Sequence, residues 1–404
     1  MNRIHKSCSG IFTVITAIIV IALLAGCGAE QLGSNFSGST LPTSLGGTGS
    51  GTGTSTGSGT GNSTGSGTGT TSGSGGGGTG GGTTGGGTGS TPAPTSTNGI
   101  PHSSHVVLVI EENHMFTEIY PNGMPWLVAQ GNKYGYTLNY HANSSVSMLD
   151  YLWLSSGSCH AKDKNDDPNS ADCGPALRPA GTQDFGCNGD GCSVGVAGAR
   201  NPATGNHITD DNIFRRLNAA GLTWKVYAES LPAGVDPTTV YESGAYVARH
   251  NPAVYYSDIY TIPNMKKNIV PFTQLAIDLA NNQLPNYSII IPNVDNDAHD
   301  GSIGQADAWL SKNVAPVLNH SSFQNGGDGL MFITFDECDA AAGGDCNGDP
   351  ERIYTAVIGP KVKPGTKSNT FYQHQSTLRT ILDAFGIEIY PGAAATTSEM
   401  KDFF

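Results

Sequence analysis

Most of the first quarter of the chain lacks charge. Between Gln31 and Gly99 there is no Lys, Arg, Asp or Glu, and Gly, Ser and Thr fill most positions. A segment of this composition cannot bury enough apolar surface to fold. Flexible-chain statistics give it a span of roughly 45 Å, comparable with the roughly 50 Å diameter expected for the rest of the chain. We therefore predict a disordered tether over residues 27–100.

Basic residues are scarce. The 404 residues include 20 Lys and Arg against 33 Asp and Glu, so that the formal net charge is −13 and the sequence pI is about 5.1. Binding to a nucleic-acid backbone needs clustered Lys and Arg, and the sequence has no such cluster. The composition therefore argues against a nucleic-acid partner and favours a small or lipid-borne substrate.

The N-terminal apolar run is too short to be a comfortable membrane span. Ile11 to Leu24 are nearly all apolar and follow a basic start, which is typical of a secretory signal. The next residues, Leu24-Ala25-Gly26-Cys27, resemble the lipobox of bacterial lipoproteins, whose cysteine is acylated. The resemblance implies a signal peptide over residues 1–26, lipid on Cys27 and a membrane-anchored protein of the cell envelope that faces the periplasm or the surface. An ordinary cleaved signal with an incidental cysteine is the alternative.

The cysteines include no CxxC pair, which makes a structural zinc site the weaker interpretation. Apart from Cys8 and Cys27, six cysteines lie in loop-like sequence, and an even number in an exported chain predicts disulfides. We expect residues 159–207 to be a long loop insertion held by such bonds. The six are Cys159, Cys173, Cys187, Cys192, Cys338 and Cys346.

Residues 101–404 contain three apolar segments that are typical of buried parallel strands, and acidic or amide residues follow each of them. The segments are Val106–Ile110 before Glu112 and Asn113, Tyr287–Ile291 before residues 293–300, and Leu330–Phe335 before Asp336 and Glu337. In an open α/β sheet, ligands bind beyond the carboxyl ends of the strands. Carboxylates gathered there resist joint ionisation unless a cation lies among them, so the pattern predicts a bound divalent metal.

The segment after the second strand is the richest in metal-binding side chains. Asp295, Asp297, His299 and Asp300 lie within six residues. Mixed carboxylate and imidazole ligands suit Zn, Mn or Fe, whereas oxygen ligands alone suit Ca or Mg. The sequence therefore leaves the identity of the metal open among these five.

Ser147 lies at the start of a predicted helix that ends near Gly157. The free amides and the positive dipole end of a helix N-terminus suit a phosphate and favour an alkoxide over a hydroxyl. Serine is also a common helix-capping residue. Ser147 is therefore a candidate nucleophile with a purely structural alternative.

Two histidines lie outside these segments. His374 is at or just before the start of a predicted helix, and as a neutral imidazole it could be a metal ligand or a general acid. His250 lies in loop sequence, where we favour a structural role.

The sequence also predicts a helix that ends at Gly221. Thr209 or Asp210 is expected to cap its start.

Seven segments, in this order, resemble the phosphoesterase family that holds bacterial acid phosphatases and phosphocholine-type phospholipases C. They are VVLVIEENHMF, the Ser147–Gly157 stretch, WKVYAESLP, YVARHNP, IPNVDNDAHDGS, FITFDE and FYQHQSTLRTILDAFG. The resemblance covers nearly all of residues 105–390. It implies an α/β, alkaline-phosphatase-like catalytic domain over residues 101–404, with a mostly parallel central sheet and helices on both faces.

The resemblance also implies roles for the candidate residues. Ser147 maps to the nucleophile, and His299 or His374 would protonate the leaving group. Asp150 maps to a substrate-binding asparagine, where an ionised carboxylate would repel a phosphate dianion. Asp295 and Asp297 compete for one metal-binding position. The full implied metal set is Glu112, Asn113, Asp336, Glu337, Asp297, His299 and Asp295.

These residues predict metal-dependent hydrolysis of phosphate esters, of acid phosphatase or phospholipase C type, through a phosphoserine intermediate. We expect a phosphate-ester or phospholipid substrate and a monomeric protein. The Cys-x-Pro-x-Arg or Ser-x-Pro-x-Arg site of sulfatases is missing, which argues against sulfate esters. The alternative is a non-catalytic, surface-tethered module for metal binding or adhesion that keeps the same fold.

Overall fold

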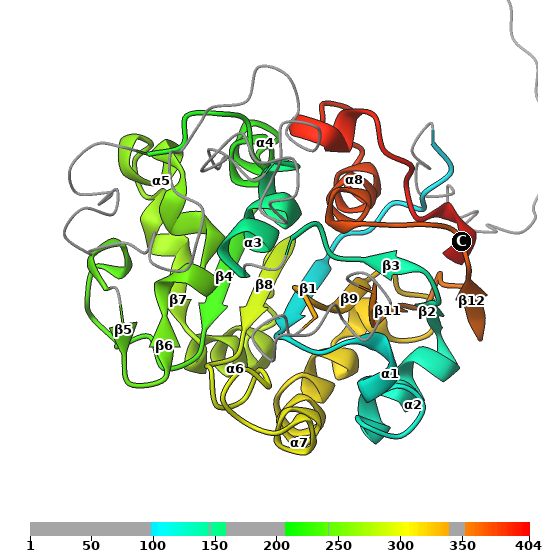
Figure 1. Cartoon of the computed structure of the whole chain (residues 1–404). Coiled ribbons are helices and arrows are strands. Elements are labelled where there is room, and N and C mark those ends of the chain that lie inside the picture. The colour runs from blue at the N-terminus through cyan, green and yellow to red at the C-terminus, as the bar shows by residue number, and fades with distance from the viewer. Residues whose placement is uncertain (1–97, 145–146, 159–206, 241, 339–351) are drawn as a thin grey trace, which may run out of the picture. The chain divides into compact units, whose positions relative to one another are not determined.

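A mostly parallel sheet forms the centre of the computed structural model, which describes residues 98–144, 147–158, 207–240, 242–338 and 352–404. Within these residues the sheet has eight strands in the order β12-β2-β11-β9-β1-β8-β4-β7 (Figure 1). The strands are β1 (Val106–Glu111), β2 (Gly135–Thr137), β4 (Trp224–Ala228), β7 (Ile269–Pro271), β8 (Tyr287–Ile291), β9 (Leu330–Phe335), β11 (Thr355–Ile358) and β12 (Thr366–Ser368).

The three strands predicted to end in acidic residues are neighbours. β1 pairs in parallel with β8 on one side and with β9 on the other, so that Val109 lies opposite both Ile290 and Ile333. All residues of the three strands are buried, which explains why their sequences are continuous apolar runs. Their carboxyl ends therefore lie side by side at one edge, as predicted. β11 runs antiparallel to β9 and to β2.

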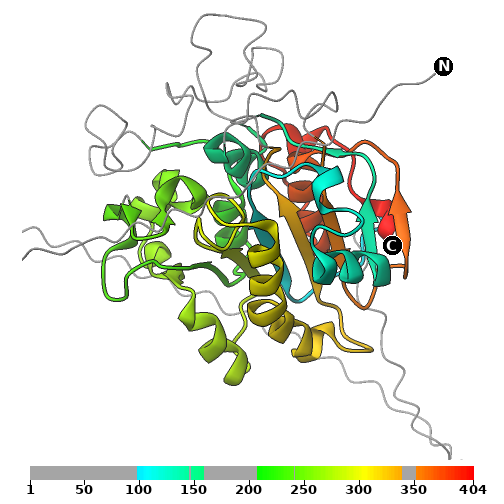
Figure 2. The ribbon, with the colours of Figure 1, turned by 60° about the horizontal axis from the view of Figure 1, so that its bottom comes forward.

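Helices cover both faces of the sheet. In Figures 1 and 2, α3, α4 and α8 lie on one side, and α2, α6 and α7 lie on the other. This arrangement confirms the predicted α/β architecture. The helices are α1 (Phe116–Ile119), α2 (Pro125–Lys133), α3 (Ser147–Ser156), α4 (Ile213–Ala219), α5 (Ser257–Thr261), α6 (Thr273–Ala280), α7 (Ile303–Asn313) and α8 (His374–Ala384).

Two small antiparallel ribbons complete the strands. β3 (Tyr140–His141) pairs with β10 (Arg352–Ile353), and β5 (Glu242–Ser243) pairs with β6 (Tyr246–Val247). A 3₁₀ helix, η4 (Ala248–His250), follows β6 directly. This connection carries His250 back toward the sheet.

The start of α4 corrects one prediction. Its N-cap is Asn212, whose side-chain oxygen accepts a hydrogen bond from the backbone N–H of Arg215 at 2.9 Å. The expectation that Thr209 or Asp210 caps this helix is wrong. Asn212 takes the role because its amide serves two partners: the oxygen caps the helix, and the nitrogen donates to Asp258 at 2.9 Å.

The folded region begins slightly before the predicted residue 101. Asn98 donates hydrogen bonds to Asp383 and to the Tyr390 hydroxyl, and Ile100 is fully buried. These contacts join the end of the predicted tether to the last part of the chain. The predicted signal peptide, the predicted lipidation site Cys27, most of the tether and most of the predicted loop insertion lie outside the described residues, as do five of the six cysteines predicted to form disulfides. No helix in the described part is long and apolar enough to cross a membrane.

Gly157 ends α3 in a conformation that other residues adopt at a cost. Its φ is 65°, and a Cβ there would lie 2.7 Å from the carbonyl oxygen of Pro391 and 3.0 Å from the backbone nitrogen of Ala393. We expect Gly157→Ala to lower the free energy of unfolding by roughly 2–4 kcal/mol, since left-handed strain and overpacking add. Urea denaturation measures this change.

Gly386→Ala is the matched control. Gly386 has a similar φ of 70°, but a Cβ there meets nothing within 4 Å. This variant should lose only the conformational part, about 1–2 kcal/mol. If both variants lose the same free energy of unfolding, the close approach of residues 391–393 to Gly157 does not contribute to the cost of the Gly157→Ala substitution.

Candidate active site

The carboxyl ends of β1, β8 and β9 are tied together by backbone hydrogen bonds. The N–H of Glu112 donates to the carbonyl of Asp297 at 2.8 Å, and the N–H of Asp336 donates to the carbonyl of Glu111 at 3.0 Å. Three segments that are far apart in the sequence therefore meet at one edge of the sheet. Their acidic side chains meet there as well.

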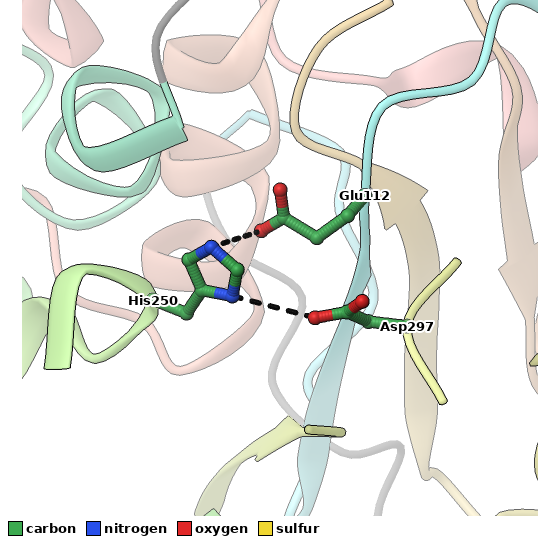
Figure 3. Close-up of side chains that lie close together, drawn as sticks. All are labelled: Glu112, His250 and Asp297. Atoms are coloured by element: carbon green, nitrogen blue, oxygen red, sulfur yellow. Dashed lines mark ion pairs between the residues drawn. The ribbon is translucent and has the colours of Figure 1, made fainter. Parts of the chain in front are cut away.

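Glu112, His250 and Asp297 form a buried cluster, with one ligand atom of each within 4.8 Å of the others. Figure 3 shows the imidazole between the two carboxylates. Nε2 of His250 is 3.4 Å from Oε1 of Glu112, and Nδ1 is 3.3 Å from Oδ2 of Asp297. The His250 ring also stacks on the ring of Tyr151, with centroids 5.4 Å apart. This geometry is that of a candidate metal site.

Burial dominates the electrostatics of this cluster. It raises the pKa of the Glu112 carboxyl well above its ordinary value, and the neighbouring carboxylates of Asp336 and Asp297 raise it further. Burial likewise raises the pKa of Asp297 and lowers the pKa of His250 well below its usual range. The imidazole is therefore neutral, which is the form that binds metal.

Several buried atoms at the site lack a hydrogen-bond partner among the described residues. They are both ring nitrogens of His250, Oδ2 of Asp297 and Oδ2 of Asp336. Buried polar atoms are normally satisfied, so orphaned nitrogen and oxygen atoms around one point need an explanation. A divalent cation would account for the carboxylate oxygens and for one of the two ring nitrogens, because carboxylate oxygen and neutral imidazole are its usual ligands. The residues present therefore fit a metal.

Ser147 lies beside this cluster. It is the first residue of α3, a helix whose residues are all buried, and it is itself 1% exposed. Its hydroxyl is 3.0 Å from Oε2 of Glu112 and 3.2 Å from Oε1 of Glu337. An ionised carboxylate has no proton to donate, so the serine hydroxyl is the donor to these oxygens. The other oxygen of Glu112 accepts from the Tyr151 hydroxyl at 2.5 Å. The serine hydroxyl thus donates to acidic residues instead of capping the helix.

Asp150 is buried against the loop that precedes α3. Its Oδ1 accepts from the backbone N–H groups of Asn143 and Ser144, at 3.0 and 3.1 Å, and its Oδ2 accepts from the Ser144 hydroxyl at 2.7 Å. The carboxylate therefore holds the loop in place. Its contact with substrate, implied by the family resemblance, stays a prediction.

The segment after β8 separates the two competing aspartates. Asp297 is fully buried in the cluster, whereas Asp295 is exposed. The loop turns sharply between the aspartates and His299, since Ala298 has a φ of 79°. The structure therefore places Asp297, and not Asp295, next to Glu112 and His250.

His299 lies at the border of the site. Its Nδ1 is 2.7 Å from Oδ1 of Asp300, and its Nε2 is 3.3 Å from a guanidinium nitrogen of Arg249. A guanidinium only donates, so Nε2 accepts and Nδ1 carries the proton that Asp300 accepts. Arg249 is a second residue, with His250, that the sequence interpretation did not place at the site.

The remaining predicted residues surround Asp336. Asn113 adopts a left-handed conformation with φ of 57°, and its backbone N–H donates to Oδ1 of Asp336 at 3.2 Å. The N–H of Glu337 donates to the same oxygen at 2.6 Å. Burial raises the pKa of Asp336 to about 6. His374 is fully buried, with Nε2 at 2.6 Å from the backbone carbonyl of Asp336.

The missed histidine had a signal in the sequence. His250 belongs to the segment YVARHNP, one of the seven that carry the family resemblance. The local sequence did not indicate its role, because His250 does not follow a predicted buried strand and has no acidic residue beside it. Only the path of η4 places it at the sheet edge.

The chain is similar to known phosphoesterases. The model of the phosphoesterase family matches residues 120–388. A phosphatidylinositol-3-phosphatase of Mycobacterium tuberculosis is 30% identical over 292 residues, which are 72% of this chain and 80% of the relative. An acid phosphatase of Aspergillus fumigatus is 32% identical over 179 residues, but these cover only 42% of this chain and 38% of that protein.

Among solved structures, a Vibrio parahaemolyticus protein in the alkaline phosphatase superfamily is 10% identical, with a TM-score of 0.47 over 76% of this chain and 74% of that one. The family model spans most of the folded region, and the mycobacterial relative covers 72% of this chain. The chain belongs to the phosphoesterase family.

Proposed function

We propose that this protein hydrolyses phosphate esters and that Ser147 is its nucleophile. One observation carries the proposal: the Ser147 hydroxyl is hydrogen-bonded to Glu112, which is also part of the buried Glu112–His250–Asp297 cluster. The carboxylate of Glu112 therefore contacts the proposed nucleophile and also belongs to the candidate cation site. The named activities of the relatives, a phosphatidylinositol phosphatase and acid phosphatases, support this chemistry.

Glu112, His250, Asp297 and Asp336 would hold the cation, with Asn113 and Glu337 as further predicted ligands. When bound, a divalent ion supplies positive charge that favours the serine alkoxide and offsets the charge of the phosphate. Ca, Mg, Mn, Zn and Fe remain the candidates.

Ser147 and Glu112 carry the first step. Oε2 of Glu112, 3.0 Å from the serine hydroxyl, is placed to accept its proton. The serine oxygen attacks phosphorus in line, and the ester oxygen leaves from the opposite side. Because Ser147 begins α3, the negative charge that develops lies at the positive end of the helix dipole.

His299 is the proposed proton carrier to the leaving oxygen. Its side chain is 23% exposed, so Nε2 can take up a proton from solvent in place of its 3.3 Å contact with Arg249, while Asp300 orients the ring through Nδ1. Water then hydrolyses the phosphoserine and regenerates Ser147. His374 is the other predicted donor, but its Nε2 faces the backbone carbonyl of Asp336 and its Nδ1 faces the Tyr140 hydroxyl.

The test is a substrate panel on metal-stripped protein, with each of the five cations returned in turn. The panel contains p-nitrophenyl phosphate, bis(p-nitrophenyl) phosphate and a phospholipid. We expect no turnover without metal and recovery with at least one cation. If the protein binds metal but turns over none of the substrates, the non-catalytic surface module is the correct interpretation.

We also propose that the protein acts at the outer side of the cytoplasmic membrane, anchored by lipid on Cys27. The lipobox-like sequence before Cys27 and the uncharged tether after it support this location. Labelling with a radioactive fatty acid tests it: wild-type protein should take up label, and a Cys27→Ser variant that is labelled equally would contradict the anchor.

A further inference from the structure

We propose that His374 is a positioning residue that holds Asp336 in place, and that it is neither a metal ligand nor the proton donor. The inference rests on the proposed function, since it assigns a role within the same site. It departs from the family resemblance, which implied one of those two roles for this histidine. The directions of its hydrogen bonds carry the argument.

Nε2 of His374 must carry a proton. It lies 2.6 Å from the backbone carbonyl oxygen of Asp336, and a carbonyl can only accept. Oδ1 of Asp150 lies 3.3 Å from the same nitrogen and offers a second acceptor. Nε2 therefore has no lone pair for a cation, and its proton is held between two acceptors.

Nδ1 of His374 faces the hydroxyl of Tyr140 at 3.2 Å. Burial raises the pKa of Tyr140 far above its usual value, so the phenol keeps its proton and can donate it to Nδ1. The Thr377 hydroxyl lies 2.8 Å from the Tyr140 oxygen and shares a hydrogen bond with it. Both ring nitrogens are therefore engaged with protein groups, and the ring is fully buried.

Asp336 is held from several directions as a result. Its N–H donates to the carbonyl of Glu111, its carbonyl accepts from His374, and its Oδ1 accepts from the backbone of Asn113 and Glu337. Oδ2 is left without a hydrogen-bond partner in the described part of the chain. The contacts thus fix the carboxylate with one oxygen available for the candidate cation.

His374 also connects the elements that build the site. Its own backbone N–H, at the start of α8, donates to Oδ1 of Asn143 at 3.2 Å, in the loop that Asp150 holds before α3. The end of β9, the start of α8 and the loop before α3 therefore meet at this one residue. Supporting groups of this kind orient the residues that bind metal and typically change affinity or activity 10–100-fold when removed.

The experiment compares His374→Gln with His374→Ala in the full chain. Glutamine keeps an N–H donor at a similar distance from the backbone, but it cannot donate a proton in catalysis. Two quantities are measured: kcat/KM on p-nitrophenyl phosphate and on glycerol phosphate, whose leaving groups differ in their need for a proton, and metal affinity by calorimetric titration. His320→Gln is the control, since His320 is a half-buried histidine that contacts His105, before the start of β1.

We expect His374→Ala to lower kcat/KM by roughly 10–100-fold on both substrates alike and to weaken metal binding by a similar factor. His374→Gln should recover most of both losses and bind as much metal per chain as the wild type. If alanine fails to fold, the glutamine variant carries the comparison with the wild type alone.

Three results would overturn the proposal. A much larger loss on glycerol phosphate than on p-nitrophenyl phosphate would make His374 the proton donor. Loss of bound metal in the glutamine variant would make it a ligand, and an alanine variant equal to the wild type would deny it any role. If the wild type hydrolyses neither ester, the proposed function fails, and the metal titration still decides whether His374 positions Asp336.

Discussion

Ser147→Ala is expected to lower phosphate-ester turnover by roughly 10⁴- to 10⁶-fold, the range seen when a member of a nucleophile and base unit is removed. The loss follows from the geometry, since the serine hydroxyl lies 3.0 Å from Glu112 and 3.2 Å from Glu337. Alanine leaves those carboxylates in place and removes the only atom that attacks phosphorus. Steady-state kinetics on p-nitrophenyl phosphate measures the effect.

A second readout separates the nucleophile from a structural serine. Rapid acid quench of the wild type with ³²P-labelled substrate should trap phosphate on Ser147, and the alanine variant should carry none. Ser156→Ala is the matched control, because Ser156 lies in the same helix, is equally buried and bonds the carbonyl of Leu152. Near-normal hydrolysis by the Ser147→Ala protein would refute the assignment.

His250→Ala should weaken metal binding by about 100-fold or more, at or beyond the upper end of the effect of removing a supporting residue. The imidazole lies 3.4 Å from Glu112 and 3.3 Å from Asp297, and its burial keeps it neutral. Without the imidazole, the buried carboxylates of Glu112 and Asp297 are left without the group between them, and the cation loses a nitrogen ligand. Calorimetric titration of the metal-stripped protein measures the affinity, and turnover at limiting metal should fall with it.

Two comparisons make this result specific. His105→Ala is the control, since His105 contacts the carbonyl of Pro285 near the start of β8. The contrast with His374 is sharper: His250→Gln should lose metal affinity, whereas His374→Gln should keep it. An unchanged metal affinity in the His250→Ala protein would mean that this histidine only packs on Tyr151 and that the cation, if bound, uses other residues.

Much of the fold was predictable because its signals are local. The apolar runs of β1, β8 and β9 predicted buried strands, and the residues that follow them predicted an acidic edge. The start of α8 at His374 and the end of α3 at Gly157 followed from turn and helix signals. The cap of α4 was misplaced by two or three residues, because several polar residues before the helix could serve and only the contact with Asp258 favours Asn212.

Other parts of the site depend on contacts that no local pattern contains. Asp295 and Asp297 are equivalent in sequence, yet the backbone bond from Glu112 to the carbonyl of Asp297 and the left-handed Ala298 bring Asp297 inside. His374 looked like an acid or a ligand until the carbonyl of Asp336 and the hydroxyl of Tyr140 accounted for both of its nitrogens.

The sequence alone therefore determined the class of the fold and the acidic edge of the sheet, because hydrophobic periodicity acts over a few residues, and the family resemblance implied the candidate nucleophile. The tertiary structure alone decided that His250 joins Glu112 and Asp297, and that Ser147 faces acids and not its own helix. The physical reason is that these choices follow from distances between side chains more than 30 residues apart, which are set only when the strands pair and the helices pack.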